Sequence, residues 1–304
     1  MPLTEEQQAE IAASRADPAL TLRAVSPGIE AWLYHPVPVL DHGFVRVIDY
    51  MGNDAAITQA ARVSYGAGTR HTRDDAGLIR YLMRHWHSTP FEMCEIKLHV
   101  KLPVFVARQW IRHRTANVNE YSARYSILDR EFYTPRPEHL AAQSRTNNQG
   151  RGETLDGAEA ARVLDLLRAD AATSYDHYQA MLSTEGQSGL ARELARMTLP
   201  ASIYTQWYWK VDLHNLFHFL RLRADPHAQY EIRAYAEAIC DIVRDWVPAA
   251  YGAFEDYRLD AVSFSGKAMA VLRRKLAGEV VTQEESGMSK GEWQEFEGVL
   301  EVKL

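Results

Sequence analysis

The stretch MCEIKLHVKL at residues 93–102 alternates apolar and polar side chains without a break, and it decides the fold. Its apolar side chains are those of Cys94, Ile96, Leu98, Val100 and Leu102. Its polar side chains are those of Glu95, Lys97, His99 and Lys101. Because successive side chains of a β-strand point to opposite faces of a sheet, this pattern predicts a half-buried strand.

Further elements are predicted on both sides of this strand. A second strand is expected at residues 202–212, SIYTQWYWKVD, where aromatic and β-branched residues gather. Helices are expected from Thr4, from Asn53/Asp54, from Thr72, from Pro103, over about 153–184, in GLARELARM before Pro200, over about 213–223, over about 227–247, and once beyond residue 265. Strands and helices intermix without regular βαβ alternation, which favours an α+β fold.

The predicted helix that follows the strand begins at Pro103, since proline suits the first helical turn. Val104, Ala107 and Ile111 mark its expected apolar face. Arg108, Gln109 and Arg112 are expected together on another face, where the two arginines repel each other at i,i+4 spacing. An anion would remove that repulsion.

Length, charge and cysteine content exclude several classes of protein. The chain has 304 residues and a formal net charge of -6, which argues against a general nucleic-acid binder. Two cysteines, Cys94 and Cys240, are too few for a disulfide framework. No apolar run approaches the ~20 residues of a membrane span, and the N-terminus does not resemble a signal peptide. We therefore expect a reduced, cytoplasmic protein that binds neither membrane nor nucleic acid.

The polar stretch RHRTANVNEYSARY at residues 112–125 has two interpretations. It could be only a hydrophilic connection, because this chain prefers arginine to lysine throughout the region. Alternatively, Arg112, Arg114 and Arg124 bind an anion together with short hydrogen-bonding residues, which suits bidentate recognition of phosphate. The residues alone leave both interpretations open.

A second polar cluster, FHFLRLRADPHAQYEI at residues 217–232, is equally ambiguous. Arg221 and Arg223 end a predicted helix, where arginine also interacts favourably with the last carbonyls. Asp225 could be only a cap.

Histidine, cysteine and serine residues offer weaker candidates. His214 and His218 have metal-ligand spacing, as do His85 and His87, but no carboxylates group beside them, so we expect no metal site. Cys94 on an apolar strand face and Cys240 inside a helix are expected to be buried rather than nucleophilic. Ser122 has no base close in sequence and is interpreted as a hydrogen-bonding residue.

The segment RHRTANVNEYS (112–122) resembles the RHR-x7-S signature of the flavin-dependent thymidylate synthases. Other segments resemble that family in the same order: HSTPFE (87–92), VARQWIRHR (106–114), NEYSARYS (119–126), ELARMTLP (193–200) and LRADPHAQYEI (222–232). The resemblance covers about residues 43–255. It implies three parts: an N-terminal extension at 1–41, a single large catalytic domain at 42–264 and a C-terminal extension at 265–304.

The resemblance implies methylation of dUMP to dTMP, in the biosynthesis of that nucleotide. 5,10-Methylenetetrahydrofolate would supply the carbon, and FAD reduced by NADPH the hydride. The implied fold is a twisted, mostly antiparallel sheet flanked by helices. It would assemble as a homotetramer with active sites between subunits.

The same resemblance implies roles for individual residues. The residues implied to bind dUMP are Gln109, Trp110, Ile111, Arg112, Glu120, Tyr121, Ser122, Ala123, Arg124, Arg196 and Arg223. Those implied to bind FAD are Thr89, Arg112, His113, Arg114, Glu120, Asp212, Leu213, His214 and His218. His87 and His227 would lie near the flavin or the folate. Arg223 would also be catalytic, lying against the uracil and favouring its N3-deprotonated form.

Asp212 and His218 depart from the family pattern, in which asparagine is frequent at both positions. Both side chains can form hydrogen bonds, although a carboxylate at Asp212 adds charge that asparagine lacks. Two other functions would use the same arginines: a metal-dependent or nucleotide-binding hydrolase, and a nucleotide sensor without catalysis.

Overall fold

The computed structural model describes residues 4–16, 18–63, 74–144, 150–182 and 189–301. The chain divides into two compact units, Met1–Phe254 and Glu255–Leu304. The predicted helix start at Thr72 and the predicted helix end at 183–184 lie outside the described residues. The domain limits after residues 41 and 264 stay predictions.

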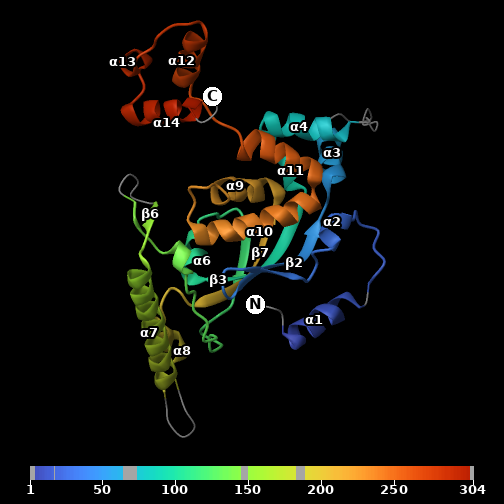
Figure 1. Cartoon of the computed structure of the whole chain (residues 1–304). Coiled ribbons are helices and arrows are strands. Elements are labelled where there is room, and N and C mark those ends of the chain that lie inside the picture. Colours follow the sequence, from blue (N-terminus) through green and yellow to red (C-terminus); the bar gives the residue numbers. More distant parts are fainter. Residues whose placement is uncertain (1–3, 17, 64–73, 145–149, 183–188, 302–304) are drawn as a thin grey trace. The chain divides into compact units, whose positions relative to one another are not determined.

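The larger unit is built on a five-stranded sheet in which the strand order is β1-β2-β3-β7-β4 and every pairing is antiparallel (Figure 1). The strands are β1 (Pro36–Val39), β2 (Gly43–Met51), β3 (Glu95–Pro103), β4 (Asn117–Glu120) and β7 (Tyr204–Asp212). A separate two-stranded sheet contains β5 (Ala141–Gln143) and β6 (Arg151–Thr154). Both predicted strands, now β3 and β7, pair with each other inside the sheet, and the α+β class is confirmed.

Strand β3 has the alternation that its sequence predicts. The side chains of Ile96, Leu98 and Val100 are fully buried, whereas Lys97 and His99 on the opposite face are only half-buried. One row of side chains is apolar and buried, and the other row meets solvent. This difference sets the register of β3 against β2 and β7, because a shift of one residue would expose the whole apolar row.

Helices cover the apolar face of the sheet. All helices of the larger unit, whether or not they contact the sheet, are α1 (Glu5–Arg15), α2 (Pro27–Glu30), α3 (Asp54–Val63), α4 (Asp75–Arg84), α5 (Thr89–Glu92), α6 (Val104–Trp110), α7 (Gly157–Met181), α8 (Arg192–Ala195), α9 (Leu213–Arg223), α10 (Tyr230–Trp246) and α11 (Pro248–Phe254). Helices α9 and α10 lie over the same face (Figure 1). In α10 the fully buried residues Ile232, Ala236, Ile239 and Val243 recur at helical spacing and form the stripe that packs on the sheet.

Three sequence expectations about helices were wrong. Pro103 is the cap of α6 rather than its first residue, and it still pairs with β7. Ile111 follows the end of α6 and is 41% exposed, while Val106 and Trp110 supply the buried face. The long helix α7 begins at Gly157, because Asp156 caps it through hydrogen bonds that its side chain accepts from the next turn.

The smaller unit has its own apolar core. Its helices are α12 (Gly266–Leu276), α13 (Gln283–Ser286) and α14 (Lys290–Glu301), preceded by a π-helical turn at Glu255–Leu259. Val271, Met288 and Phe296 are buried together. The predicted basic helix is α12, and the acidic segment that follows it forms two further helices. Among the described residues of both units, no helix has the length and apolarity needed to cross a membrane.

Replacing Leu98 by alanine tests the role of β3. The side chain is fully buried, so we expect the free energy of unfolding to fall by about 2–5 kcal/mol. Lys97→Ala is the matched control on the opposite face, where the lysine pairs with a half-exposed Asp49, and we expect a change within about 0.5 kcal/mol. Urea unfolding followed by circular dichroism measures both. Equal losses for the two variants would contradict the assignment of faces.

Candidate active site

Helix α6 separates two pockets that together contain nine of the predicted site residues. Arg108 lines one pocket, and its neighbour in sequence, Gln109, lines the other. The expectation that Arg108, Gln109 and Arg112 share one face is therefore wrong. Adjacent residues on a helix are rotated by about 100°, and Arg112 lies beyond the end of α6.

The first pocket, here the Ser122 pocket, has a volume of about 690 Å³. Its charged and polar lining residues are Arg108, Asn119, Glu120, Tyr121, Ser122, Arg124, Arg196 and Thr205. It thus brings the predicted segment 120–124 next to Arg196, which lies far away in sequence.

Backbone pairing holds segment 120–124 in this pocket. Glu120 ends the edge strand β4, opposite Trp207 of β7, and its carboxylate accepts a hydrogen bond of 2.9 Å from the Thr205 hydroxyl. Ser122 then opens a turn in which its carbonyl accepts from the Tyr125 N–H at 3.1 Å. The Ser122 hydroxyl accepts from the Arg124 N–H at 3.3 Å. The Ser122 hydroxyl thus accepts a hydrogen bond within the turn, and its predicted contact with the nucleotide stays a prediction.

The second pocket, here the Arg223 pocket, has a volume of about 550 Å³. It is lined by Gln109, Arg221, Leu222, Arg223, Asp225, His227, Ala228 and Gln229. The Gln109 Oε1 atom is buried and has no hydrogen-bond partner among the described residues. A buried acceptor of this kind normally has a donor, so a bound molecule or water that supplies one fits this pocket.

The loop that closes the Arg223 pocket is tied down at several points. Asp225 accepts hydrogen bonds from the His227 backbone N–H at 2.7 Å and from its ring at 2.9 Å. Gln229 donates to the buried carboxylate of Glu231 at 2.9 Å. Asp225 therefore acts as a turn residue within the pocket wall.

Glu231 in turn joins three segments of the chain. It accepts hydrogen bonds from Arg151 on β6 at 2.6 Å and from the Tyr133 hydroxyl at 3.0 Å. Burial alone would raise the pKa of Glu231, but hydrogen bonds from Arg151 and Gln229 outweigh it and hold the pKa below its usual value. The carboxylate thus stays charged and anchors the loop.

Arg223 meets His113 of the RHR segment inside the fold. The Arg223 Nε donates a hydrogen bond of 3.1 Å to the His113 Nε2. Burial, with the charges of Arg223 and His218, lowers the pKa of His113 to about 4. Burial and nearby Arg112 also lower the pKa of Arg223. The structure therefore brings Arg223 and His218 of α9 close to His113 and Arg112 of the segment after α6.

The arginines around both pockets lack acidic partners. Among the described residues, no carboxylate forms an ion pair with Arg108, Arg112, Arg114, Arg124, Arg196, Arg221 or Arg223. Elsewhere in the same chain Arg62, Arg130 and Arg244 do pair with aspartates. Glu120 and Asp225 line the same pockets, but the arginines form no ion pair with them. Cations without such ion pairs favour anionic ligands such as phosphates.

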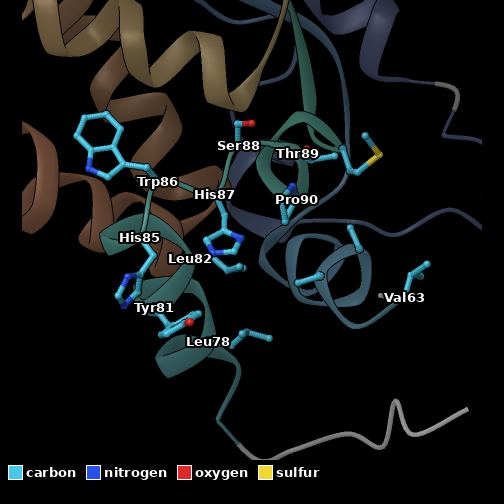
Figure 2. Close-up of a pocket in the computed structure, with 13 residues that line it drawn as sticks. Val63, Leu78, Tyr81, Leu82, His85, Trp86, His87, Ser88, Thr89 and Pro90 are labelled. Carbon is cyan, nitrogen blue, oxygen red and sulfur yellow. The ribbon is translucent and has the colours of Figure 1, made fainter. Parts of the chain in front are cut away.

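A third pocket, here the His87 pocket, has a volume of about 770 Å³ and contains the predicted residues His87 and Thr89. Figure 2 shows the His87 ring turned toward Leu82 and Tyr81, whereas the Trp86 indole points away from them. The Tyr81 and His85 rings lie with centroids 4.4 Å apart. The pocket is thus walled by aromatic rings, which suits a planar ligand.

The end of α4 sets the direction of these rings. His85 caps the helix and Trp86 adopts φ 62°, the left-handed region usually taken by glycine at this position. The His87 N–H then donates to the Leu82 carbonyl at 3.0 Å, and the Trp86 N–H to the Met83 carbonyl at 3.3 Å. This pair of bonds is the Schellman arrangement, and it turns His87 back toward the pocket.

Some predicted residues do not present their side chains to a pocket. Trp110 and Leu213 are fully buried, so only their backbone atoms could meet a ligand. Asp212 caps α9, since its carboxylate accepts from the Asn215 backbone at 2.9 Å and from the Asn215 side chain at 2.7 Å. The departure at Asp212 thus has a local structural role.

The remaining predicted residues lie nearby but line none of these pockets. Ile111, Arg112 and Arg114 are exposed beyond the end of α6. His214 and His218 lie on α9, and the His218 and His113 ring centroids are 5.7 Å apart.

Sequence reasoning missed several lining residues. The sequence predicts that Arg108 and Arg112 repel each other, and this repulsion could have identified Arg108 as a residue of the site. Gln229 lies inside segment 222–232, which is one of the segments that carry the family resemblance, so that segment could have identified it. Tyr81 carried no signal, because an aromatic residue on an amphipathic helix is ordinarily part of a core.

The two cysteines lie apart from these pockets. Burial, reinforced by the charge of Asp54, raises the pKa of Cys94 to about 12, and burial raises the pKa of Cys240 to about 11. Both thiols are buried and free. In the described part of the chain, no three histidine, cysteine or acidic side chains group as metal ligands do.

Comparison with known proteins places the chain in a family. The family model described as thymidylate synthase complementing protein matches residues 46–249. A flavin-dependent thymidylate synthase from Ruegeria pomeroyi is 75% identical over 300 residues, with 99% of each chain covered. One from Gluconobacter oxydans is 64% identical, with 99% of each chain covered. One from Rickettsia bellii is 57% identical and covers 92% of this chain and 98% of its own.

A solved structure agrees with these relatives. The UMP/dUMP methylase PolB from Streptomyces cacaoi, bound with 5-Br dUMP, is similar with a TM-score of 0.65 and 31% identity. The match covers 73% of this chain and 99% of that chain.

The buried thiols lead to a chemical test. Because the pKa of both cysteines is raised, almost no thiolate exists at pH 8, and thiolate is the reactive form. We expect Ellman's reagent to label neither Cys94 nor Cys240 within minutes in the native protein and to label both after unfolding in guanidinium chloride. Fast stoichiometric labelling of native protein would show an accessible nucleophilic cysteine and contradict this site description.

Proposed function

The chain belongs to the flavin-dependent thymidylate synthase family, and on that premise we propose that it methylates dUMP to dTMP at a site assembled from two subunits. The observation that carries the proposal is the division of the nucleotide-binding residues between the Ser122 pocket and the Arg223 pocket, on either side of α6. Methylenetetrahydrofolate is the proposed carbon donor and NADPH the proposed reductant.

The Ser122 pocket is the proposed phosphate and sugar half of the nucleotide site. Arg108, Arg124 and Arg196 line it, and in the part of the chain that the structure describes none of them forms an ion pair with a carboxylate. Arg196 donates its Nε to the Glu193 carbonyl at 3.3 Å, which orients the rest of its guanidinium. Arginine forks of this kind bind phosphate oxygens in pairs. The Ser122 hydroxyl and the Tyr121 and Ala123 backbone complete the proposed contacts.

The Arg223 pocket is the proposed uracil half. Uracil C5 becomes nucleophilic only as negative charge develops in the ring, and a cation held beside N3 and O2 stabilises that charge. Arg223 is already positioned by its bond to His113, so it needs no reorganisation when the charge appears. Gln109 lies in the same pocket, and its buried Oε1 has no partner among the described residues, so it can accept a hydrogen bond from a donor of the bound ligand or from water.

The residues that would hold FAD fit a cofactor with a diphosphate. Arg112 and Arg114 are exposed beyond the end of α6 and form no ion pair among the described residues. His113 and His218 lie beside them with ring centroids 5.7 Å apart, next to the α9 residue His214. Bound FAD supplies the hydride that reduces the transferred carbon. The arginines and histidines named above would bind and orient the FAD, and the arginines would offset the negative charge of its diphosphate.

The His87 pocket is the proposed site for the ring of a second planar molecule, the folate or the flavin. His87 and Thr89 line it next to Tyr81, and His227 serves the same role at the Arg223 pocket. Ring stacking on Tyr81 and His85 would hold such a molecule while its polar groups meet the histidines.

A homotetramer is part of the proposal. Segment 120–124 and Arg196 would meet Arg223 and Gln109 of another subunit, because α6 separates these groups within one chain. Cys94 and Cys240 are free thiols, which suits a reducing compartment, and we place the enzyme in the cytoplasm.

Arg223→Ala tests the proposed chemistry. We expect kcat for dTMP formation to fall by about 10²–10³-fold, because the cation that stabilises developing charge is lost. The flavin absorbance of the purified protein should stay, since Arg223 is not a proposed FAD contact. Leu222→Ala, an exposed neighbour in the same pocket wall, should cost much less. A purified wild-type protein that is colourless and takes up no FAD would contradict the proposal as a whole.

Mixing two inactive variants tests the division of the site between subunits. Arg196→Ala damages the Ser122 half and Arg223→Ala the other half. When both chains are co-expressed and mix at random, about a quarter of the sites receive two intact halves, and about that fraction of activity should return. The double variant Arg196→Ala/Arg223→Ala mixed with itself is the control. If the mixture has no more activity than the two separate variants, both halves belong to one chain and the proposed arrangement is wrong.

A further inference from the structure

We propose that His113 is a positioning residue for Arg223: its neutral Nε2 accepts the Arg223 Nε–H and so aims the two terminal amino groups of the guanidinium at the uracil. This inference rests on the proposed function only in assigning uracil to Arg223. It gives the central residue of the RHR segment a role of its own, beside the proposed FAD contacts of that segment.

The position of His113 is fixed by a backbone hydrogen bond and by a ring contact with Phe219. Its backbone N–H donates to the Trp110 carbonyl at 3.0 Å just after α6 ends. The ring meets Phe219 edge to face, with centroids 5.0 Å apart and planes at 78°. Phe219 is fully buried and stacks on Trp110 at 4.6 Å. A ring fixed by a packed core can hold an arginine more firmly than a side chain on a loop can.

The protonation state of His113 follows from its partner. Arginine has only donors, so the His113 nitrogen at 3.1 Å must accept, and the remaining proton of the neutral ring lies on Nδ1. The charged groups that face the ring are Arg223 and the imidazole of His218 on α9, and both disfavour a charged His113. Arg112, from the segment that contains His113, acts on Arg223 itself. His113 therefore remains an acceptor at neutral pH.

The hydrogen bond also decides which side of Arg223 is free. A guanidinium can pair with a planar ligand through Nε and one terminal nitrogen or through both terminal nitrogens. The Nε is used by His113, and among the described residues no hydrogen bond to either terminal nitrogen is present. Arg223 lines the Arg223 pocket. Its two terminal nitrogens are therefore the pair that can donate to two adjacent acceptors such as uracil N3 and O2.

Two variants of His113 separate positioning from bulk. His113→Gln places an amide oxygen near the Nε2 position and keeps an acceptor, whereas His113→Leu keeps apolar packing and removes it. With FAD affinity measured for each variant and FAD saturating, we expect Leu to weaken dUMP binding by about tenfold. We expect Gln to weaken it by less than about threefold. Equal losses for Gln and Leu would overturn the proposal.

A double-mutant cycle decides whether His113 acts through Arg223. In the Arg223→Ala background the change His113→Leu should leave dUMP affinity unaltered within about twofold, because the group it positions is already gone. A further tenfold loss in that background would show that His113 acts independently, for example through FAD, and would overturn the proposal.

A measurement on the protein without ligands distinguishes a failure of the positioning role of His113 from a failure of the proposed function. ¹⁵N-histidine labelling of the wild-type protein, assigned with His113→Gln, should show His113 as the Nδ1–H tautomer. Its pKa should lie far below the usual value of about 6.5 and rise in Arg223→Ala. An Nε2–H tautomer, or an unchanged pKa in that variant, would overturn the positioning role. If instead this signature is present but wild-type protein binds no dUMP, the contact stands and the proposed function fails.

Discussion

The packing of Trp110 is the constraint on which the arrangement of the site depends. Its fully buried ring stacks on Phe219 of α9 at 4.6 Å and meets Trp209 of β7 at 5.1 Å and Tyr235 of α10 at 5.9 Å. One side chain thus locks the short helix α6 against the sheet and two helices. Large aromatic side chains contribute much of the burial that stabilises a core. Because α6 cannot rotate, Arg108 and Gln109 are held toward different pockets.

The stability of this packed core offsets the electrostatic cost of holding arginines close together. Arg112 lies close enough to Arg223 to disfavour the charge of Arg223, which is also partly buried. Placing cations together without ion-pair partners among the described residues destabilises the protein without ligand, and the packed core must offset that cost. The gain comes on binding, since an anion meets charges already in place and loses little to reorganisation. The neutral His113 fits the same logic, because it holds Arg223 without adding charge.

The elements with buried, regular patterns were predictable. Strand β3 and helix α9 lie where the sequence places them, because apolar periodicity reports directly on burial. Strand β2 was missed because a register shift between Val47 and Asp49 breaks its alternation. Strand β4 was missed because all four of its residues are exposed; it is held by backbone pairing to β7 and by the hydrogen bond from Thr205 to Glu120. Its place inside the polar stretch 112–125 shows that a hydrophilic segment can still be part of a sheet.

The sequence by itself determined which residues we propose to carry the chemistry, namely the arginines, the RHR segment and Ser122, and it predicted that both cysteines are buried. It also determined the family, since motif order and residue types are properties of the chain alone. Only the tertiary structure decided how those residues group. It placed Arg196 beside segment 120–124, Arg223 against His113, and the helix α6 between the two sets. The physical reason is that contacts between distant segments depend on core packing, and the sequence pattern of a segment records its burial but not its neighbours.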